Sequence, residues 1–275
     1  MPNFIVGARL HDYGKGTPDE LFGKVSADGF AAVQLAYKKC VPTVKSYADV
    51  TDALVAETVA AEKAHHIQVA VLGTYVELAI NDESRLCNVA DFKSQLAVCK
   101  ALGAGCIGTE TTAMSKQPAG TTRAQAQELL CRSLAEILPA AEALGVTVGI
   151  EPVTYHSMTS AAATRHILDT MRSPNLKVIF DMSNLVSAEN VDAQDRIWYD
   201  MGTLLGDQIV AVHFKGQAFA PDGSLLHTSL EESRTDYAGA FAMLRQLPQP
   251  ALPVLREEAV PARAASDITF MKGFF

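Results

Sequence analysis

The sequence has little that would direct the protein to nucleic acid or to a membrane. Its 275 residues include 23 Lys and Arg against 31 Asp and Glu, which gives a net charge of −8. Binding to a phosphate backbone needs clustered positive charge, and the sequence contains no such run. No apolar run approaches the roughly 20 residues that span a bilayer. We therefore expect neither a nucleic acid nor a membrane as a partner.

Signals of secretion are also missing. The chain begins Met-Pro-Asn-Phe-Ile-Val-Gly, without a basic segment followed by an apolar one, and no N-x-S/T sequon occurs. The cysteines are odd in number and none belongs to a C-x-x-C pair, which is typical of buried thiols in a reduced compartment. They are Cys40, Cys87, Cys99, Cys106 and Cys131. We expect a cytoplasmic protein.

Nucleotide-binding loops are absent as well. No G-x-x-x-x-G-K-[ST] sequence occurs. The stretch Gly103–Gly108 does match G-x-G-x-x-G, but a dinucleotide fingerprint must follow a strand and open a helix. This stretch follows a predicted helix and leads into a predicted strand, so its glycines indicate a tight turn.

Short apolar runs alternate with amphipathic stretches along the whole chain, in a composition with 48% hydrophobic and 20% charged residues. Such a composition is that of a soluble globular protein with an ample core. The starts of the runs are about 27 to 44 residues apart, which leaves room for a helical crossover between parallel strands. The predicted strands are Phe4–Ala8, Ala31–Ala36, Gln68–Leu72, Cys106–Thr109, Thr147–Ile150, Lys177–Phe180, Ile209–Val212 and Pro253–Leu255.

Several predicted helices end at a glycine that precedes the next strand, as helix C-termini commonly do. They are Asp91–Leu102 before Gly103, a helix capped by Thr121 or Thr122 that runs to Leu144 before Gly145, and Val191–Leu205 before Gly206. No linker rich in Pro or Ser divides the chain, so we expect a single domain over residues 1–275. Eight strands that alternate with helices favour an α/β fold, a (β/α)8 TIM barrel, over an open doubly wound sheet.

Four successive predicted strands, the fifth to the eighth, end in a side chain that can bind a metal ion. These side chains are Glu151, Asp181, His213 and Glu257, at intervals of 30, 32 and 44 residues. Singly, such a residue is more often a helix cap or a surface group. Together they lie at the C-terminal edge, where TIM barrels carry their active sites. Three carboxylates and one imidazole suit a divalent ion such as Mn²⁺, Mg²⁺, Co²⁺ or Zn²⁺.

Glu258 competes with Glu257 for the last of these positions. Strand side chains alternate between faces, so an inward Glu257 places Leu255 inside the barrel and Arg256 outside. An inward Glu258 would instead place Arg256 in an interior that is normally apolar. Alternation therefore favours Glu257.

At the strand ends the chain resembles the xylose isomerase-like barrels. This superfamily contains sugar and sugar-phosphate isomerases and epimerases, inosose dehydratases and endonuclease IV-type enzymes. The resemblance covers essentially the whole chain. Its blocks are Ile150–Val153, Phe180–Asn184, Val212–Lys215 and Leu255–Glu258, with further similarity at Val71–Tyr75 and Gly108–Thr111.

The resemblance implies roles for the four strand-end residues. Glu151, Asp181, His213 and Glu257 would be the metal ligands, and Glu151 and Glu257 would also be the acid/base pair of a metal-dependent sugar or sugar-phosphate isomerase or epimerase. Removal of a proton next to a carbonyl needs an electrophile that holds the enediolate charge, and a divalent ion supplies it. Two carboxylates can then remove the proton from one position and return it to another.

The resemblance leaves other functions open. An inosose dehydratase-like lyase would use the same metal and bases. An endonuclease IV-like hydrolase would need more histidine ligands, and an inactive sugar-binding barrel would bind without turnover. Many sugar epimerases of the superfamily have D-x-x-H after strand six and an arginine after the strand-seven histidine. This chain has Asn184 in the first case and no arginine between Phe214 and Ala220 in the second, so a simple ketose 3-epimerase is less favoured.

Polar residues in the loops that follow the strands are candidates for contact with a small carbohydrate substrate. We expect His11, Glu110, His156, Asn184 and Lys215 in this group; for His156 the alternative is loop packing or capping. Lys215 shares a face with His213 by alternation, so it is expected to point toward a substrate oxygen or phosphate. Gln34 on the second strand is a weaker candidate. The sequence leaves a homo-oligomer open.

Overall fold

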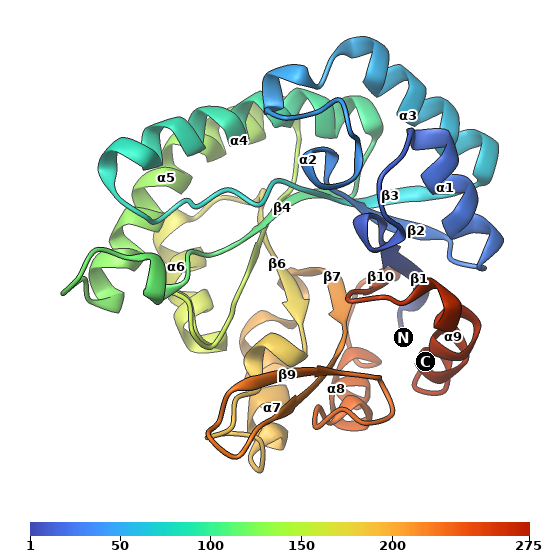
Figure 1. Cartoon of the computed structure of the whole chain (residues 1–275). Coiled ribbons are helices and arrows are strands. Elements are labelled where there is room, and N and C mark those ends of the chain that lie inside the picture. Colours follow the sequence, from blue (N-terminus) through green and yellow to red (C-terminus); the bar gives the residue numbers. More distant parts are fainter.

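The centre of the protein is a closed barrel of eight parallel strands, as the computed structural model shows (Figure 1). The structure describes residues 1–275 apart from the side chain of Asp82. Each barrel strand pairs with its neighbours in the chain, and the last pairs with the first, with Gly7 opposite Leu255. In chain order the barrel strands are β1 (Asn3–Arg9), β2 (Ala32–Leu35), β3 (Gln68–Gly73), β4 (Cys106–Glu110), β5 (Val148–Glu151), β6 (Leu176–Asp181), β7 (Ile209–Phe214) and β10 (Ala251–Arg256). All eight predicted strands are thereby confirmed.

Helices surround this barrel on the outside, as Figure 1 shows. The arrangement is that of a (β/α)8 TIM barrel, which confirms the predicted fold class. The α-helices are α1 (Pro18–Ala27), α2 (Tyr37–Cys40), α3 (Asp52–His65), α4 (Asp82–Leu102), α5 (Arg123–Leu144), α6 (Ala161–Met171), α7 (Gln194–Leu205), α8 (Tyr237–Leu244) and α9 (Ala264–Lys272). Two short 3-10 helices at the barrel mouth are η1 (Leu10–Tyr13) and η4 (Ser183–Leu185).

The predicted helix ends agree with the structure better than the predicted starts. Gly103 and Gly145 end α4 and α5 in the left-handed region, at φ 65° and 67°. Thr122 caps α5, in a box with Gln125. By contrast, α4 begins at Asp82, well before the predicted Asp91, because its cap is Asn81. Helix α7 begins at Gln194 instead of Val191, and Gly206 keeps a right-handed helical φ of −53°.

Small and branched side chains fill the interior of the barrel below its mouth. They form one buried cluster, composed of Ala32, Ala70, Val71, Cys106, Ile179, Ala211 and Leu255. The space is tight: a Cβ added to Gly149 would lie 2.8 Å from Cγ1 of Ile179. Close packing leaves little room below the mouth. The open cavity therefore lies above Val71 and Ile179, where polar groups at the strand ends border it.

A two-stranded hairpin, which the sequence did not predict, follows β7. Its strands β8 (Gly216–Phe219) and β9 (Leu225–Thr228) pair antiparallel. The amide of Gln217 anchors it by donating to the carbonyl oxygens of Ser183 and Val186, at 2.7 and 3.1 Å. The hairpin is therefore fixed to the loop that follows β6.

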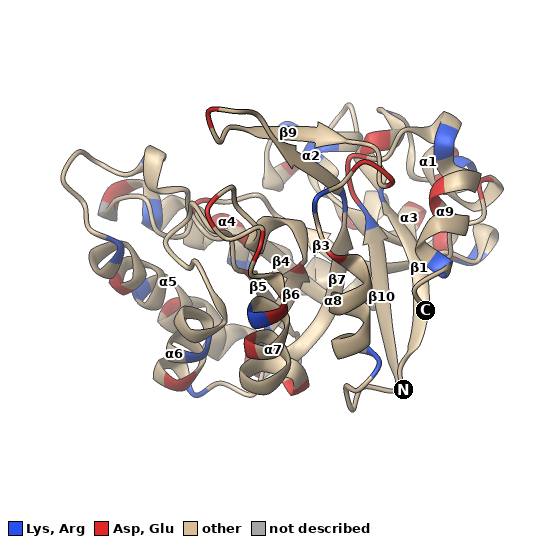
Figure 2. Ribbon diagram, turned by 90° about the horizontal axis from the view of Figure 1, so that it is seen from below, with Lys and Arg blue, Asp and Glu red and all other residues tan. Residues whose placement is uncertain are grey.

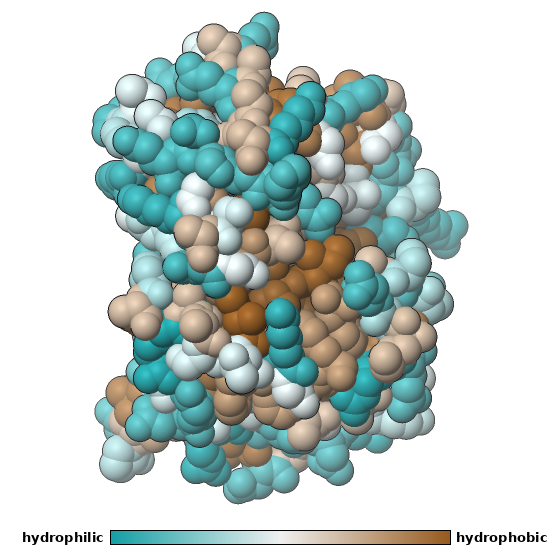
Figure 3. Space-filling model, turned by 90° about the vertical axis from the view of Figure 1, so that its right-hand side faces the viewer, coloured by the Kyte–Doolittle hydropathy of each residue, from teal (hydrophilic) through white to brown (hydrophobic). Residues whose placement is uncertain are grey.

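Charged residues of both signs are interspersed along the outer helices (Figure 2). On the side that faces right in Figure 1, apolar residues gather in a central area bordered by hydrophilic ones (Figure 3). The two chain ends lie close together (Figure 1), with the rings of Phe4 and Phe275 5.1 Å apart. No helix among the described residues combines the length and the apolar character that crossing a membrane requires.

Candidate active site

Three of the four predicted ligand residues converge at the C-terminal edge of the barrel. Glu151, Asp181 and His213 are buried, and one candidate ligand atom from each lies within 4.8 Å of the others. The parallel register produces this convergence, because it sets the last residue of β6, Asp181, directly opposite His213 on β7. Nδ1 of His213 lies 3.1 Å from a carboxylate oxygen of Glu151.

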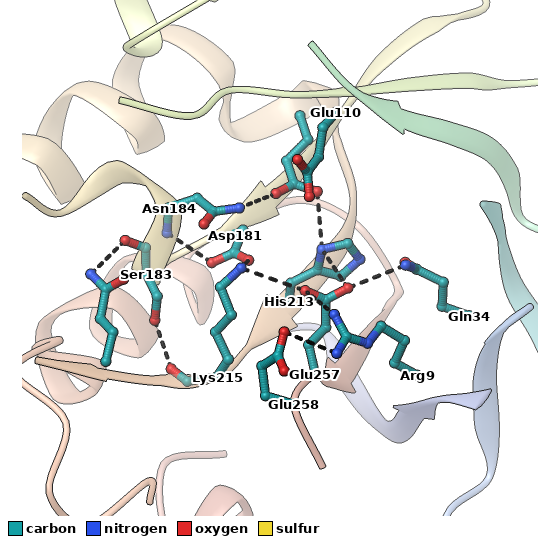
Figure 4. A network of polar contacts seen from close by, with 12 residues as sticks. Arg9, Gln34, Glu110, Asp181, Ser183, Asn184, His213, Lys215, Glu257 and Glu258 are labelled. Atoms are coloured by element: carbon teal, nitrogen blue, oxygen red, sulfur yellow. Dashed lines mark hydrogen bonds and ion pairs between the residues drawn. The ribbon is translucent and has the colours of Figure 1, made fainter. Parts of the chain in front are cut away.

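The fourth predicted ligand, Glu257, lies on the other side of His213 (Figure 4). Its Oε1 is 3.5 Å from Nδ1 of His213 and accepts a hydrogen bond of 3.2 Å from the amide of Gln34. Glu257 is buried and borders the same cavity as Glu151. It therefore completes a ring of acidic groups around His213.

Side chains next to Glu257 alternate as expected. Leu255 is buried in the barrel interior, and Arg256 points outward to α9, where its Nε lies 2.7 Å from Asp267. Glu258 has a positive φ of 54°, and its half-exposed carboxylate pairs with Arg9 at 2.9 Å. The interior position is thus taken by Glu257 and not by Glu258.

The ammonium group of Lys215 lies among these carboxylates. Its Nζ is 2.8 Å from Oδ2 of Asp181 and 3.6 Å from Oε2 of Glu257. The Lys215 carbonyl accepts hydrogen bonds from the hydroxyl groups of Ser183 and Tyr237, at 2.7 and 2.8 Å, which fixes the backbone. Burial acts to lower the pKa of Lys215, but the charges of Asp181 and Glu257 outweigh it and hold that pKa well above its usual value.

Asn184 contacts two of the predicted ligands. Its backbone N–H donates to Oδ1 of Asp181 at 2.9 Å, and its side-chain amide donates to a carboxylate oxygen of Glu151. The first turn after β6, η4, supplies this geometry. Asn184 therefore orients both carboxylates, and its side-chain amide is hydrogen-bonded to Glu151, which lines the cavity.

Glu110 and His156 lie together on the β4–β5 side of the mouth. Glu110 lines the central cavity, and its carboxylate is 3.9 Å from Nε2 of His156. Although 41% of its side-chain surface is exposed, Glu110 lies in a concave mouth, where the surrounding protein and the Glu151 charge raise its pKa to about 8. His156 is buried, which lowers its pKa to about 4, and it borders a neighbouring pocket instead of the central cavity.

His11 packs against a residue that lines the cavity. It lies in η1, and its ring meets the edge of the Tyr75 ring at a centroid distance of 5.6 Å. Tyr75 lines the cavity, and its hydroxyl accepts a 2.8 Å hydrogen bond from Gln34. Burial lowers the pKa of His11 to about 4. The structure thus places His11 behind Tyr75.

Sequence reasoning missed Arg9 altogether. Its guanidinium pairs with Asp12 at 2.7 Å and lies 3.8 Å from Glu257. A cation at the end of the first strand, two residues before His11, was the available signal. Because Arg9 and Gln34 both contact Glu257, they set the position of that carboxylate.

The buried groups polarise one another strongly. Burial raises the pKa of Glu151. For His213, burial lowers the pKa, but the charges of Glu257 and Glu151 outweigh it and raise the value to about 9. For Glu257, burial raises the pKa, but the charges of His213 and Lys215, with Arg9, outweigh it and lower the value to about 2.

The donor set fits a divalent cation. Two donors that each lie about 2.0–2.5 Å from one ion can be no more than about 5 Å apart, and the atoms of Glu151, Asp181 and His213 satisfy this bound. Nε2 of His213 is buried and has no hydrogen-bond partner among the described residues. Glu257, within 3.5 Å of His213, can add a fourth oxygen ligand.

Comparisons with known proteins agree with this architecture. A family model described as a xylose isomerase-like TIM barrel matches residues 22–272. Among curated proteins the sequence has no significant match.

Several solved structures are similar over nearly their full length. The apo form of the 3-keto-D-glucoside 4-epimerase YcjR from E. coli is 16% identical, with a TM-score of 0.72 over 98% of this chain and 100% of that one. A D-allulose 3-epimerase from Methylomonas sp. is 14% identical, with a TM-score of 0.73 over 100% and 99%. The IolI protein with a bound zinc atom is 16% identical, with a TM-score of 0.74 over 100% and 96%. At these identities the similarity shows a common fold.

Proposed function

The chain belongs to the xylose isomerase-like TIM barrel family, and we propose that it is a divalent-metal-dependent sugar or sugar-phosphate isomerase or epimerase. The observation that carries the proposal is the meeting of Glu151, Asp181 and His213 within 4.8 Å at the mouth of the barrel. Similar structures described as sugar epimerases, and one described with zinc, support it.

In this proposal Glu151, Asp181, His213 and Glu257 hold a divalent ion from the group Mn²⁺, Mg²⁺, Co²⁺ and Zn²⁺. When bound, a divalent ion stabilises the negative charge that develops on the substrate oxygens after proton removal. The ligand set of carboxylates and one imidazole is compatible with each of these ions.

Glu151 and Glu257 are the proposed acid/base pair. Their carboxylates both approach Nδ1 of His213, at 3.1 and 3.5 Å, and both residues border the central cavity. A substrate carbon in that cavity would face one carboxylate from each side. One of them can take the proton next to the carbonyl, and the other can return a proton to the opposite face or to the neighbouring carbon.

Five further residues act beside the pair in this proposal. Asn184 donates to Glu151 and so orients the oxygen that accepts the proton. Arg9 and Gln34 contact Glu257. Lys215, held beside Asp181, offers an ammonium group to a substrate oxygen. Glu110 lines the cavity from β4 and can bind a substrate hydroxyl.

The test is proton exchange in D₂O. Purified protein supplied with Mn²⁺, Mg²⁺, Co²⁺ or Zn²⁺ is mixed with a panel of keto-sugars and keto-polyols, and ¹H NMR follows the proton next to each carbonyl. The proposal predicts deuterium incorporation together with an isomerised or epimerised sugar. A dehydrated enone or dione would identify a lyase, and binding without any exchange would identify a sugar-binding barrel.

A further inference from the structure

A second pocket lies beside the central cavity and opens to solvent. It is larger than the central cavity. Its walls are the loop after β5, the loop after β6 and the hairpin β8–β9. The hairpin contributes Gln217, Phe219, Gly223 and Leu225. We call this space the outer pocket.

Asn184 links the outer pocket to an acidic residue of the central cavity. This residue lines the outer pocket, and its amide donates to Glu151, which lines the central cavity. The backbone N–H of Thr154, another wall residue, donates to the Asn184 carbonyl at 2.9 Å. A substrate with its reacting carbon beside Glu151 and a second unit on the Asn184 side would place that unit at the outer pocket.

The hairpin is held in place as a wall of the outer pocket. Gln217 at its base is buried and donates to two carbonyl groups of the loop after β6. At its tip, Gly223 has a positive φ of 82°, and a Cβ added there would lie 3.6 Å from the Cβ of Ala188. Both ends of the hairpin thus rest on the same loop, so the outer pocket is part of the fold and not a gap between unrelated segments.

The charges in the outer pocket nearly cancel. Arg123 directs its guanidinium to the carbonyl oxygens of His156 and Thr154, at 3.3 and 3.4 Å. Glu189 accepts a 2.7 Å hydrogen bond from the hydroxyl of Ser187. Phosphate recognition favours an Arg whose donors are directed at the ligand, and an acidic neighbour would oppose it. The outer pocket therefore suits a neutral ligand.

Polar and apolar residues both line the walls. Thr154 and Thr159 are among the polar ones, and Phe219 and Leu225 are among the apolar ones. Ligand pockets combine apolar walls with a few placed polar groups. A sugar ring has the matching chemistry, with hydroxyls around its edge and C–H groups on its faces.

We propose that the outer pocket is a subsite for a second sugar residue, so that the preferred substrates are keto-sugars that carry a glycosyl unit. The inference rests on the proposed function, because the keto-sugar itself is assigned to the central cavity. The neutral walls also indicate that the distal unit is a glycosyl group and not a phosphate.

Two adjacent leucines on β9 allow a matched test. Leu225 lines the outer pocket, whereas Leu226, the next residue, points to the other face of the hairpin because strand side chains alternate. Their exposed fractions are similar, 39% and 46%, so an aspartate at either position should be tolerated by the fold. Leu225→Asp places a charge in the outer pocket, and Leu226→Asp places the same charge outside it.

The experiment compares D-fructose with glucosyl-fructose disaccharides that are joined through different fructose hydroxyls and keep a free ketone. Deuterium exchange next to the ketone is followed by NMR for the metal-loaded wild type and both variants. At least one disaccharide should have a kcat/KM about tenfold or more above that of D-fructose, and Leu225→Asp should lower it by a similar factor, equivalent to about 1.4 kcal/mol. Leu226→Asp should lie within about twofold of the wild type, within the range usual for surface changes.

Failure of this inference can be distinguished from failure of the proposed function. Equal turnover of D-fructose and every disaccharide, or equal effects of the two variants, would overturn the subsite and leave the isomerase or epimerase intact. If no sugar exchanges at all, the proposed function fails. Saturation-transfer NMR with the same disaccharides then decides the subsite: it stands if glucosyl protons are saturated in the wild type but not in Leu225→Asp, and falls otherwise.

Discussion

The Nζ of Lys215 lies 2.8 Å from Oδ2 of Asp181, inside the group of residues that the strand ends bring together. Both side chains are buried. An ammonium group at this position balances carboxylates that would otherwise repel one another, and it does so from the same strand end that supplies His213. The ammonium group of Lys215 therefore stabilises the metal-free site, and a bound divalent ion would share the carboxylates of the site with Lys215.

Replacement of Lys215 should make the fold more dependent on metal. Lys215→Met keeps the length of the side chain but leaves Asp181 without its buried partner, a change that costs about 3 kcal/mol or more when a buried pair is broken. We expect a clear drop in the Tm of the metal-free variant, and a larger rise in Tm on addition of Mn²⁺ than the wild type shows, because the ion then supplies the missing positive charge. A metal-free variant as stable as the wild type would show that the pair contributes little.

His213 should make the stability of the metal-free protein depend on pH. Its pKa is raised from 6.5 to about 9 in the folded state, because the charges of Glu257 and Glu151 outweigh burial. A raised pKa contributes stability that is fully present below pH 6.5 and is lost as the pH rises through 9. The difference in unfolding free energy between the wild type and His213→Gln should therefore be largest, at up to about 3 kcal/mol, below pH 6.5. It should shrink as the pH rises to 9. Chemical denaturation across pH 6 to 9.5 measures it; a difference that grows with pH would contradict the assignment.

Glu151→Gln should remove turnover more thoroughly than substrate binding. The glutamine can still accept the hydrogen bond from Asn184 but cannot take a proton, and loss of a general base typically costs about 10²–10⁴-fold in rate. We expect deuterium exchange to fall by at least about 100-fold while the affinity for sugar changes much less, as measured by calorimetry. Exchange at the wild-type rate would exclude Glu151 as the base.

The adjacent glutamates 257 and 258 form a matched pair of variants. Glu257 is buried beside His213, whereas Glu258 is half-exposed and pairs with Arg9. Glu257→Gln should abolish exchange and weaken metal binding. Glu258→Gln should keep activity within about threefold, because exposed ion pairs contribute about 1 kcal/mol or less. The reverse order of effects, in exchange assays and metal titrations, would assign the fourth ligand to Glu258.

Much of the fold and of the central site could be predicted because both depend on local periodicity. An apolar run that stops at Asp181 or His213 specifies a strand and also the edge at which it ends. The alternation of side chains along β10 sufficed to predict that Glu257 points inward and Arg256 outward. The ion pair of Arg256 with Asp267 agrees with this prediction. These inferences need only neighbouring residues in the chain.

Other parts depend on contacts between distant residues, which a single sequence does not reveal. Gln34 reaches Glu257 across 223 positions, and Arg9 reaches it from the opposite end of the chain. The hairpin was missed because its strands have four residues each, and those of β9 are largely exposed. The position of His11 depends likewise on how η1 packs against Tyr75.

The central claim is that Glu151, Asp181, His213 and Glu257 bind one divalent ion. Titration of metal-free protein with Mn²⁺, followed by electron paramagnetic resonance of the free ion, tests it most directly. We predict one tightly bound ion per chain in the wild type and loss of that binding in Asp181→Asn, with Glu258→Gln retaining it. Absence of stoichiometric binding in the wild type, or binding that survives in Asp181→Asn unchanged, would contradict the account.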